Sequence, residues 1–520
     1  MSLRSWSYPN LYKDSVSLMT VSAKLTATRG VEQASVVMAT PANLENLARA
    51  GLGKYEARAN DLLVAVSGSD DACAEALRLA DELLSARAEA GGSGEAADEP
   101  LTSIQMAVAR DPSLNLALIS VPGDYAAAEA MKALRLGMDV MLFSDNVPVE
   151  KELALKLYAR ERDLMVMGPD CGTAIVGGVP LGFANVVRRG AIGVVGASGT
   201  GTQEVTVRIH RLGQGISHAL GTGGHDLSAK IGGISMLHGF AALDADPATR
   251  VIVLVSKPPA PEVAERVLAA AEGSAKPVVV VFLGADPASI KGEAVYGART
   301  LAEAADMAVS LAKGGEARAA PIALSNETER VLDGAARAMA ASQRYVRGVF
   351  SGGTFCYEAQ LVHAAAGVRA FANTPVEGNL PLKDSAKSQQ NTIIDMGDDE
   401  FTRGRPHPMI DPSQRNARVG QEIADPETAV VLFDVVLGYG ASADPTAGLV
   451  GTVGAARAGA KTAGRQVALI AHVCGTELDP QKRDTVVAAL KSAGVLVASS
   501  NAEAAVWSTA IVAARSGAAK

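Results

Sequence analysis

Residues 192–209 read IGVVGASGTGTQEVTVRI: an apolar run, then a series of small residues, then a segment with helical periodicity. An apolar run without alternation is typical of a strand buried on both faces of a parallel sheet. The small residues at 196–201 fit a tight turn, and we expect a helix to begin near Thr202. The stretch therefore predicts a doubly wound α/β unit.

Buried strands of the same kind recur on both sides of this stretch and alternate with helix-period segments. The expected strands are 114–121, 140–143, 164–167, 251–255, 278–283, 347–350, 392–395, 429–435, 467–471 and 495–498. Two stretches rich in small and polar residues, 85–103 and 312–327, predict linkers. The fold class we expect is α/β and multidomain, with a small α/β module before the first linker.

Composition and charge exclude several classes of protein. The chain has 520 residues and a net charge of −8, without a basic cluster, so we expect no nucleic-acid partner. The first residues lack a signal-peptide pattern and no apolar run reaches membrane-spanning length, which predicts a cytoplasmic protein that binds no membrane. The four cysteines lie far apart and the seven histidines show no ligand spacing. We therefore expect no metal site.

The turn at 196–201 has the chemistry of an anion cradle. Backbone N–H groups at a helix N-terminus attract phosphate or carboxylate, and the hydroxyls of Ser198 and Thr200 strengthen this reading. The candidate anion-binding residues are Ser198, Gly199, Thr200 and Gly201. The alternative is a turn whose glycines serve sterics alone.

A second turn follows the apolar run at 430–437. Here the candidate anion-binding residues are Gly438, Gly440, Ala441 and Ser442, and we expect Asp444-Pro445 to open a helix. Two such helix ends suggest one shared site, although a purely structural turn explains this segment equally well.

Two further segments carry candidate residues. MGPDCG at 167–172 ends a predicted strand, where Pro169, Asp170 and Cys171 would line a ligand crevice. A simple Pro-Asp turn with a buried, inert cysteine is the alternative. In RGRPHPMID at 403–411, Arg403 and Arg405 could clamp a carboxylate, with His407 as the acid or base. A solvated or capping histidine is the alternative there.

These motifs resemble a known family. GPDCGT at 168–173 and GASGTGTQE at 196–204 are similar to segments of the succinyl-CoA synthetase α subunit, and NTIIDMGDDE at 391–400 and VVLFDVVLGYGASADP at 430–445 to segments of its β subunit. NLYKDSVSLM, LMVMGPDCGT, GRPHPMIDP and ADPTAGLV resemble the FdrA family more closely still. His225 lies in a stretch that resembles a loop near CoA in the synthetase, and is a candidate for the same crevice.

The resemblance implies a fused α-like and β-like chain. Its domains would be the N-terminal module at 1–85, a Rossmann-like CoA-binding-type domain at 104–190, and two flavodoxin-like ligase-type domains, α-type at 191–315 and β-type at 340–520. For FdrA proteins it implies carbamoyl transfer in purine (allantoin) catabolism, in which oxalurate and phosphate give oxamate and carbamoyl phosphate. We then expect small anionic substrates, partner proteins of the pathway, an oligomer, and no certain cofactor, with CoA left open.

Two departures from the synthetase pattern matter. The synthetase carries its phosphorylated histidine after a strand equivalent to 278–283, but residues 283–301 here contain no histidine. An ATP-grasp domain should also precede the β-type segment, and 312–341 is too short for one. The alternatives to carbamoyl transfer are a subunit of a nucleotide-dependent acyl-CoA ligase and a non-catalytic scaffold.

The missing histidine gives the first prediction. The purified chain should not become phosphorylated on histidine when it is incubated with labelled ATP, or with acyl-CoA and phosphate. An acid-labile phosphohistidine detected by mass spectrometry on any of the seven histidines would contradict the loss of ligase chemistry.

Overall fold

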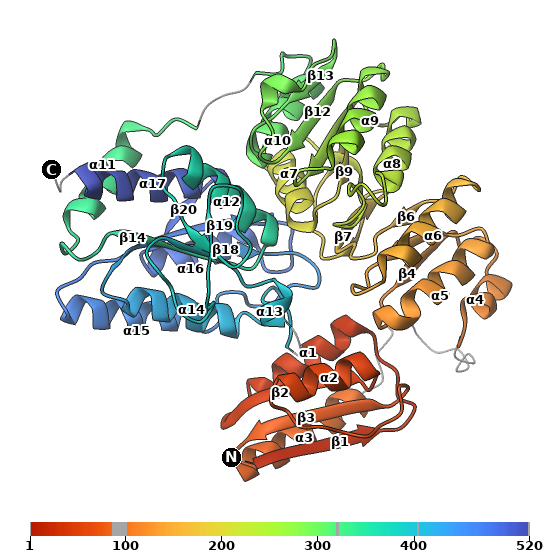
Figure 1. Ribbon diagram of the computed structural model, residues 1–520, viewed down its shortest axis with the longest axis horizontal. Coiled ribbons are helices and arrows are strands. Elements are labelled where there is room, and N and C mark those ends of the chain that lie inside the picture. The colour runs from red at the N-terminus through yellow and green to blue at the C-terminus, as the bar shows by residue number, and fades with distance from the viewer. Residues whose placement is uncertain (1, 86–100, 319–321, 403–404, 518–520) are drawn as a thin grey trace. The chain divides into compact units, whose positions relative to one another are not determined.

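The computed structural model describes residues 2–85, 101–318, 322–402 and 405–517 (Figure 1). Residues 86–100 and 319–321 of the expected linkers, and Arg403, lie outside the described residues. The chain divides into two compact units. The first holds Met1–Cys171 and Asp399–Asp411, and the second holds Gly172–Asp398 and Pro412–Lys520.

The first unit begins with the expected small α/β module. Its three-stranded antiparallel sheet has the order β1(Ser2–Tyr8)-β3(Leu62–Gly68)-β2(Val31–Met38), and its helices are α1(Ser15–Thr26), α2(Pro41–Arg49) and α3(Asp70–Ser85). Alternate residues of β3 enter two cores: Val64 packs with α1 and α3, whereas Leu63 packs with α2. The sequence analysis did not predict β1, because its residues are mostly polar and exposed.

The rest of the first unit is a small parallel sheet in the order β4-β5-β6. Its elements are α4(Ile104–Arg110), β4(Leu116–Ile119), α5(Gly123–Arg135), β5(Asp139–Leu142), α6(Val149–Arg160) and β6(Val166–Met167). Buried alanines of α5, such as Ala126 and Ala130, let this helix lie close to the strands. Asp399–Asp411, which includes α13(Asp399–Thr402), also belongs to this unit.

The second unit contains two seven-stranded sheets. The first has the order β13-β12-β11-β9-β10-β7-β8. Its elements are β7(Thr173–Val176), β8(Val179–Gly182), β9(Arg189–Gly196), α7(Gly199–Arg211), β10(Ile216–Gly221), α8(Ile234–Ala245), β11(Val251–Ser256), α9(Pro261–Glu272), β12(Val278–Phe282), η1(Pro287–Ser289), β13(Val295–Gly297) and α10(Leu301–Ala312). The expected domain boundary at 190 is misplaced, because β7 pairs with β10 and β8 with β7 in this sheet.

The other sheet of this unit is parallel throughout, in the order β16-β15-β17-β14-β18-β19-β20. Its elements are α11(Asn326–Arg337), β14(Tyr345–Phe350), α12(Gly353–Ala365), β15(Phe371–Ala372), β16(Leu380–Pro381), β17(Thr392–Asp395), α14(Ser413–Ala424), β18(Thr428–Val436), α15(Leu449–Thr462), β19(Ala468–Cys474), α16(Arg483–Ser492), β20(Leu496–Ala498) and α17(Asn501–Gly517). In Figure 1, α11, α12 and α17 cover one face, and α14 and α15 the other.

The strands predicted from apolar runs are confirmed in both units. Each of the ten runs, and the run at 192–195, coincides with a strand of a parallel pairing. Among the described residues, no helix combines the length and hydropathy that crossing a bilayer requires.

Candidate functional site

The N-terminus of α7 lies directly after the carboxyl end of β9. Ser198 is the N-cap: its Oγ accepts the N–H of Gly201 at 3.0 Å, and its carbonyl accepts the N–H of Thr202 at 3.1 Å. The N–H groups of Gly199 and Thr200 therefore precede the first intrahelical bond and point out of the helix end. This is the geometry that favours an anion.

The glycines of this turn have different reasons to be there. A Cβ at Gly196 would lie 2.0 Å from Thr202 Oγ1, and one at Gly201 would lie 2.6 Å from Ser198 Oγ. A Cβ at Gly199 would meet only Thr173 Oγ1, at 3.6 Å. Sterics thus account for two of the glycines but not for Gly199, which is exposed at the helix end.

A second helix N-terminus lies against that of α7. It is that of α12, whose N-cap is Gly352, and the two helices meet where Ser198 Oγ lies 2.6 Å from Thr354 Oγ1. A Cβ on Gly352 would lie 3.0 Å from Thr200 Cγ2. We call Ser198–Thr200 together with Gly352–Thr354 the α7–α12 junction. Sequence analysis missed α12, although Gly352-Gly353 after a buried strand was a usable signal.

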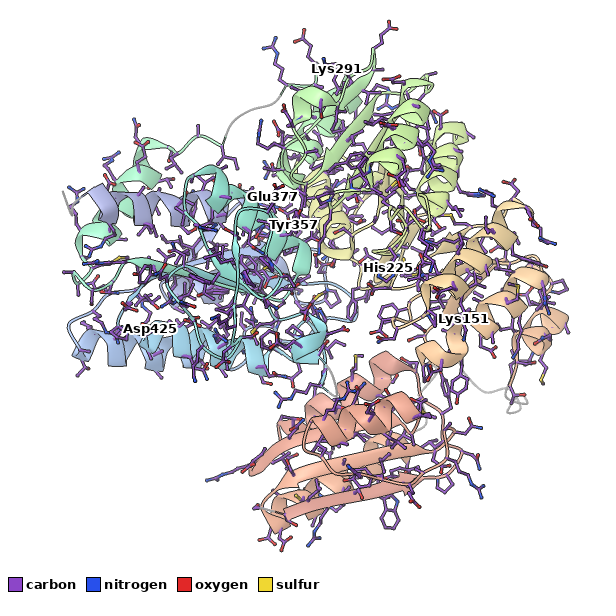
Figure 2. The ribbon with its side chains drawn as sticks, viewed as in Figure 1. Lys151, His225, Lys291, Tyr357, Glu377 and Asp425 are labelled. Carbon is purple, nitrogen blue, oxygen red and sulfur yellow. The ribbon has the colours of Figure 1, made fainter. Side chains whose placement is uncertain are left out.

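A lysine stands beside this junction. Lys257 follows β11, which pairs with β9 so that Val255 lies opposite Gly196. Lys257 Nζ lies 5.6 Å from the ring centre of Tyr357, a residue near the start of α12 that is labelled in Figure 2. The exposed ammonium of Lys257 is therefore held near both helix N-termini.

Two buried carboxylates lie close to the start of α12. Asp434, on β18, accepts the N–H groups of Ser351 and Gly352, both at 2.7 Å. Asp395, at the end of β17, accepts the N–H of Gly397 at 2.9 Å, and a Cβ on Gly353 would lie 2.6 Å from its Oδ2. Burial raises the pKa of Asp395 to about 6, and the positive charge of Lys257 opposes this. Asp395 can therefore change protonation near neutral pH.

The second predicted turn does not begin a helix. α15 starts only at Leu449, because the Asp444 side chain accepts the N–H groups of Thr446 and Ala447 and closes a local turn. The expectation that Asp444-Pro445 opens a helix is therefore wrong. Residues 438–442 therefore do not lie at the N-terminus of a helix, and a helix dipole does not favour an anion there.

Residues 438–442 form a loop that packs on the segment before β9. Gly438, Gly440, Ala441 and Ser442 are held through Gln481, whose amide donates to the carbonyls of Gly438 at 2.9 Å and Ser442 at 3.1 Å. The N–H of Gly438 donates to Gln481 Oε1 at 3.0 Å. Gly440 has φ 77°, and a Cβ there would lie 2.7 Å from the Phe183 ring. Close packing accounts for these glycines.

The predicted acid or base His407 and Arg405 belong to the first unit, and the α7–α12 junction to the second. Arg405 is exposed and Arg403 is outside the described residues. The N–H of Met409 donates to His407 Nδ1 at 3.2 Å, and burial lowers the pKa of His407 to about 4. Its imidazole is therefore neutral at physiological pH.

The predicted crevice residues also divide between the units. Pro169 and Cys171 are buried and Asp170 is exposed, at the carboxyl end of β6 in the first unit. The N–H groups of Asp170 and Cys171 donate to the carbonyls of Ser144 and Leu142. His225 is exposed in the second unit, after β10. Pro169, Asp170 and Cys171 thus share one unit, and His225 belongs to the other.

Buried polar contacts hold the two sheets of the second unit together. Asp479 accepts hydrogen bonds from the Asn185 amide at 2.8 Å and the N–H of Val186 at 2.7 Å. Glu358, on α12, accepts the N–H of Leu301 at 2.9 Å and the amide of Asn501 at 2.8 Å. Sequence reasoning missed these contacts because their partners lie far apart in the chain.

Three family models match this chain. They are a CoA-ligase domain over residues 349–511, a CoA-binding domain over 187–284, and a model described as AllF, heavy metal-associated domain, over 1–100. The CoA-binding match covers β9 to β12 and the α7 turn. It overlaps only the last residues, 187–190, of the segment 104–190 that the sequence analysis expected to be of the CoA-binding type.

The chain is also similar to individual proteins. The chain is 43% identical over 505 residues to the uncharacterized protein YahF of Escherichia coli K12, covering 96% of this chain and 97% of YahF. It is 30% identical to the α2 subunit of ADP-forming succinate–CoA ligase from Archaeoglobus fulgidus, over 30% of this chain and 54% of that subunit. Among solved structures, ATP citrate lyase from Methanothrix soehngenii, in complex with citrate and coenzyme A, aligns with a TM-score of 0.35 at 19% identity over 44% of this chain and 45% of its own.

The contacts of Glu358 give a pH prediction. Burial raises the pKa of this carboxyl from 4.5 to about 7. A carboxyl with a higher pKa in the folded state stabilises the fold when it is protonated. This contribution is complete below pH 4.5 and is lost as the pH rises through about 7.

The wild type should lose unfolding free energy of the second unit between about pH 5 and about pH 8. Glu358→Gln should make this loss smaller, by at most ~3 kcal/mol. Chemical denaturation at both pH values measures this. Glu265→Gln, which changes an exposed residue of α9, is the control and should keep the wild-type dependence. Equal pH dependence in wild type and Glu358→Gln would show that Glu358 does not titrate in this range.

Proposed function

The chain belongs to the FdrA family of succinyl-CoA-synthetase-like proteins, and we propose that it transfers a carbamoyl group between an oxo-acid amide and phosphate. The observation that carries this proposal is the α7–α12 junction, where two helix N-termini meet beside the ammonium of Lys257. Such an arrangement suits a phosphate-sized anion at the carboxyl ends of parallel strands.

In the proposed reaction, a phosphate oxygen attacks the ureido carbonyl carbon of oxalurate. The C–N bond to the oxamate nitrogen then breaks, and this nitrogen takes up the proton that the phosphate gives up, which leaves oxamate and carbamoyl phosphate. The N–H groups of Gly199 and Thr200 and the ammonium of Lys257 would hold the phosphate. Asp395 would pass the proton, because its pKa of about 6 suits both directions of transfer.

The match at 1–100 to the AllF model supports a place in allantoin catabolism. Oxalurate and oxamate, the substrate and product proposed above, are expected in the same pathway. The absence of histidine from residues 283–301 also favours a reaction that needs no phosphohistidine. The carboxylate clamp that the sequence predicts at Arg403 and Arg405 stays a prediction, and we propose that partner proteins are required for full activity.

A second function is favoured by different observations. The matches to CoA-ligase and CoA-binding models support a subunit of an acyl-CoA ligase that receives its nucleotide chemistry from another subunit. Thermal-shift titrations with CoA and ATP on one side, and carbamoyl phosphate, oxamate and oxalurate on the other, distinguish the two functions. A ligand of the native state raises the melting temperature according to its affinity.

The role of Lys257 gives a prediction for carbamoyl transfer. Lys257→Met should weaken binding of phosphate and carbamoyl phosphate about 10-fold to 100-fold, because a hydrogen bond to a charged group contributes about 1.5–3 kcal/mol. Isothermal titration calorimetry on the full chain measures the two affinities.

The matched control is Lys291→Met. Lys291 is also exposed, but it precedes β13 at the amino end of the same sheet, since Val295 pairs with the first residue of β12. The Lys291→Met variant should bind phosphate and carbamoyl phosphate with the affinities of the wild type. Unchanged binding by Lys257→Met would remove the junction as the phosphate site, and saturable binding of CoA but not of carbamoyl phosphate would favour the ligase.

A further inference from the structure

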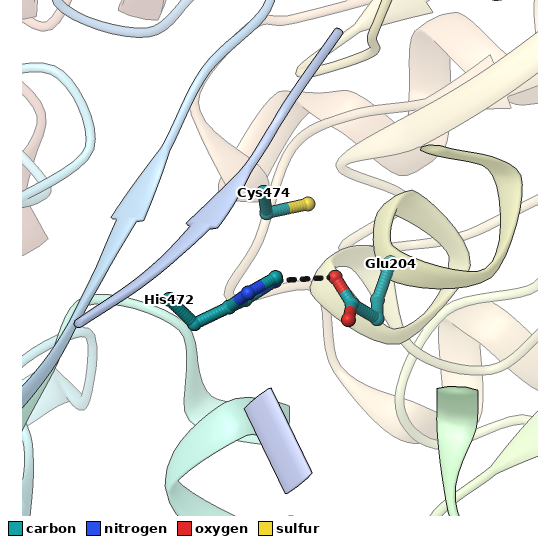
Figure 3. A group of neighbouring side chains, drawn as sticks. All are labelled: Glu204, His472 and Cys474. Atoms are coloured by element: carbon teal, nitrogen blue, oxygen red, sulfur yellow. Dashed lines mark hydrogen bonds and ion pairs between the residues drawn. The ribbon is translucent and has the colours of Figure 1, made fainter. Parts of the chain in front are cut away.

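Three side chains with metal-binding atoms lie close together between α7 and β19. Glu204 comes from α7, and His472 and Cys474 come from β19, with their ligand atoms all within 4.8 Å of one another (Figure 3). All three residues are buried. The cluster joins a helix of the first sheet to β19 of the second sheet, and Glu204 and His472 are 268 residues apart in the sequence.

His472 pairs with another member of the cluster through one of its two ring nitrogens. Its Nε2 lies 2.6 Å from Glu204 Oε2, and its ring meets Phe355 edge-on at 5.6 Å. Among the described residues, the buried Nδ1 atom has no hydrogen-bond partner. Nε2 is therefore the ring nitrogen that faces the other members of the cluster, and the proposal concerns this atom.

The donor types match one class of metal. An imidazole nitrogen, a carboxylate oxygen and a thiolate sulfur together favour a borderline ion such as Zn²⁺ over Mg²⁺ or Ca²⁺, which prefer oxygen alone. A carboxylate and a thiolate also neutralise the two positive charges of the ion, so the occupied cluster carries no net charge in the protein interior.

We propose that Glu204, His472 and Cys474 bind one zinc ion that ties α7 to β19. Binding forms bonds from the ion to one Glu204 oxygen, His472 Nε2 and Cys474 Sγ. The thiol proton leaves to solvent, and the imidazole proton moves from Nε2 to Nδ1. The Glu204–His472 hydrogen bond opens to admit the ion, and a water completes the tetrahedral set of four ligands.

This proposal differs from the expectation drawn from the sequence. Spacing alone predicted no metal site, because metal-ligand motifs are recognised by residues close together in the chain. His472 and Cys474 are two residues apart on one strand, so their side chains share a face, but the third ligand lies on a distant helix. The site also stands independently of carbamoyl transfer, since it needs no substrate.

The test uses the full chain, stripped with a chelator and then titrated with zinc or cobalt. We expect about one zinc ion per chain by elemental mass spectrometry, and with Co²⁺ a near-ultraviolet absorption band from thiolate-to-metal charge transfer. Cys474→Ser should lose this band and most of the bound metal. Cys356→Ser, a matched change of another buried cysteine, should keep both.

Folding defects are separated from ligand loss by a second measurement. Zinc should raise the melting temperature of wild type and of Cys356→Ser, and it should not raise that of Glu204→Gln. Either of two results overturns the proposal: a stripped wild-type chain that takes up no zinc and shows no cobalt–thiolate band, or a band of full intensity in Cys474→Ser.

Discussion

Buried carboxylates that accept main-chain N–H groups hold the second unit in its observed form. Asp434, Asp479 and Glu358 each lie in the interior, and each receives two or more hydrogen bonds from the other sheet or from a helix start. A carboxylate leaves water only where such donors replace its hydration. These side chains therefore set where α12 begins and how the carboxyl ends of the two sheets meet.

The same requirement shapes the α7–α12 junction. Asp434 accepts the N–H groups of Ser351 and Gly352, which precede the first turn of α12, so both helices keep first-turn N–H groups for an external anion. The neighbouring carboxylates would repel a bound anion, and the positive charge of Lys257 offsets this repulsion. The proposed phosphate site thus draws on two helix ends, of which α7 has a side-chain cap at Ser198 and α12 has none.

The chain combines family features with a clear departure from them. α-like and β-like segments of the succinyl-CoA synthetase type lie in one compact unit, so both helix ends come from a single polypeptide. The histidine that ligase chemistry would phosphorylate is absent from residues 283–301. The attack by phosphate on a carbamoyl carbon that we propose requires anion binding, assigned to the junction and Lys257, and proton transfer, assigned to Asp395.

The sequence by itself determined the buried strands and the turn before α7, because burial on both faces of a parallel sheet requires an uninterrupted apolar run. It placed a helix wrongly at Asp444-Pro445 and a boundary wrongly at 190, where a side-chain turn and strand pairing override local pattern. Only the tertiary structure joined Ser198 to Thr354 and Glu204 to His472. Contacts between residues more than 150 positions apart depend on how whole sheets pack, and no local spacing encodes that packing.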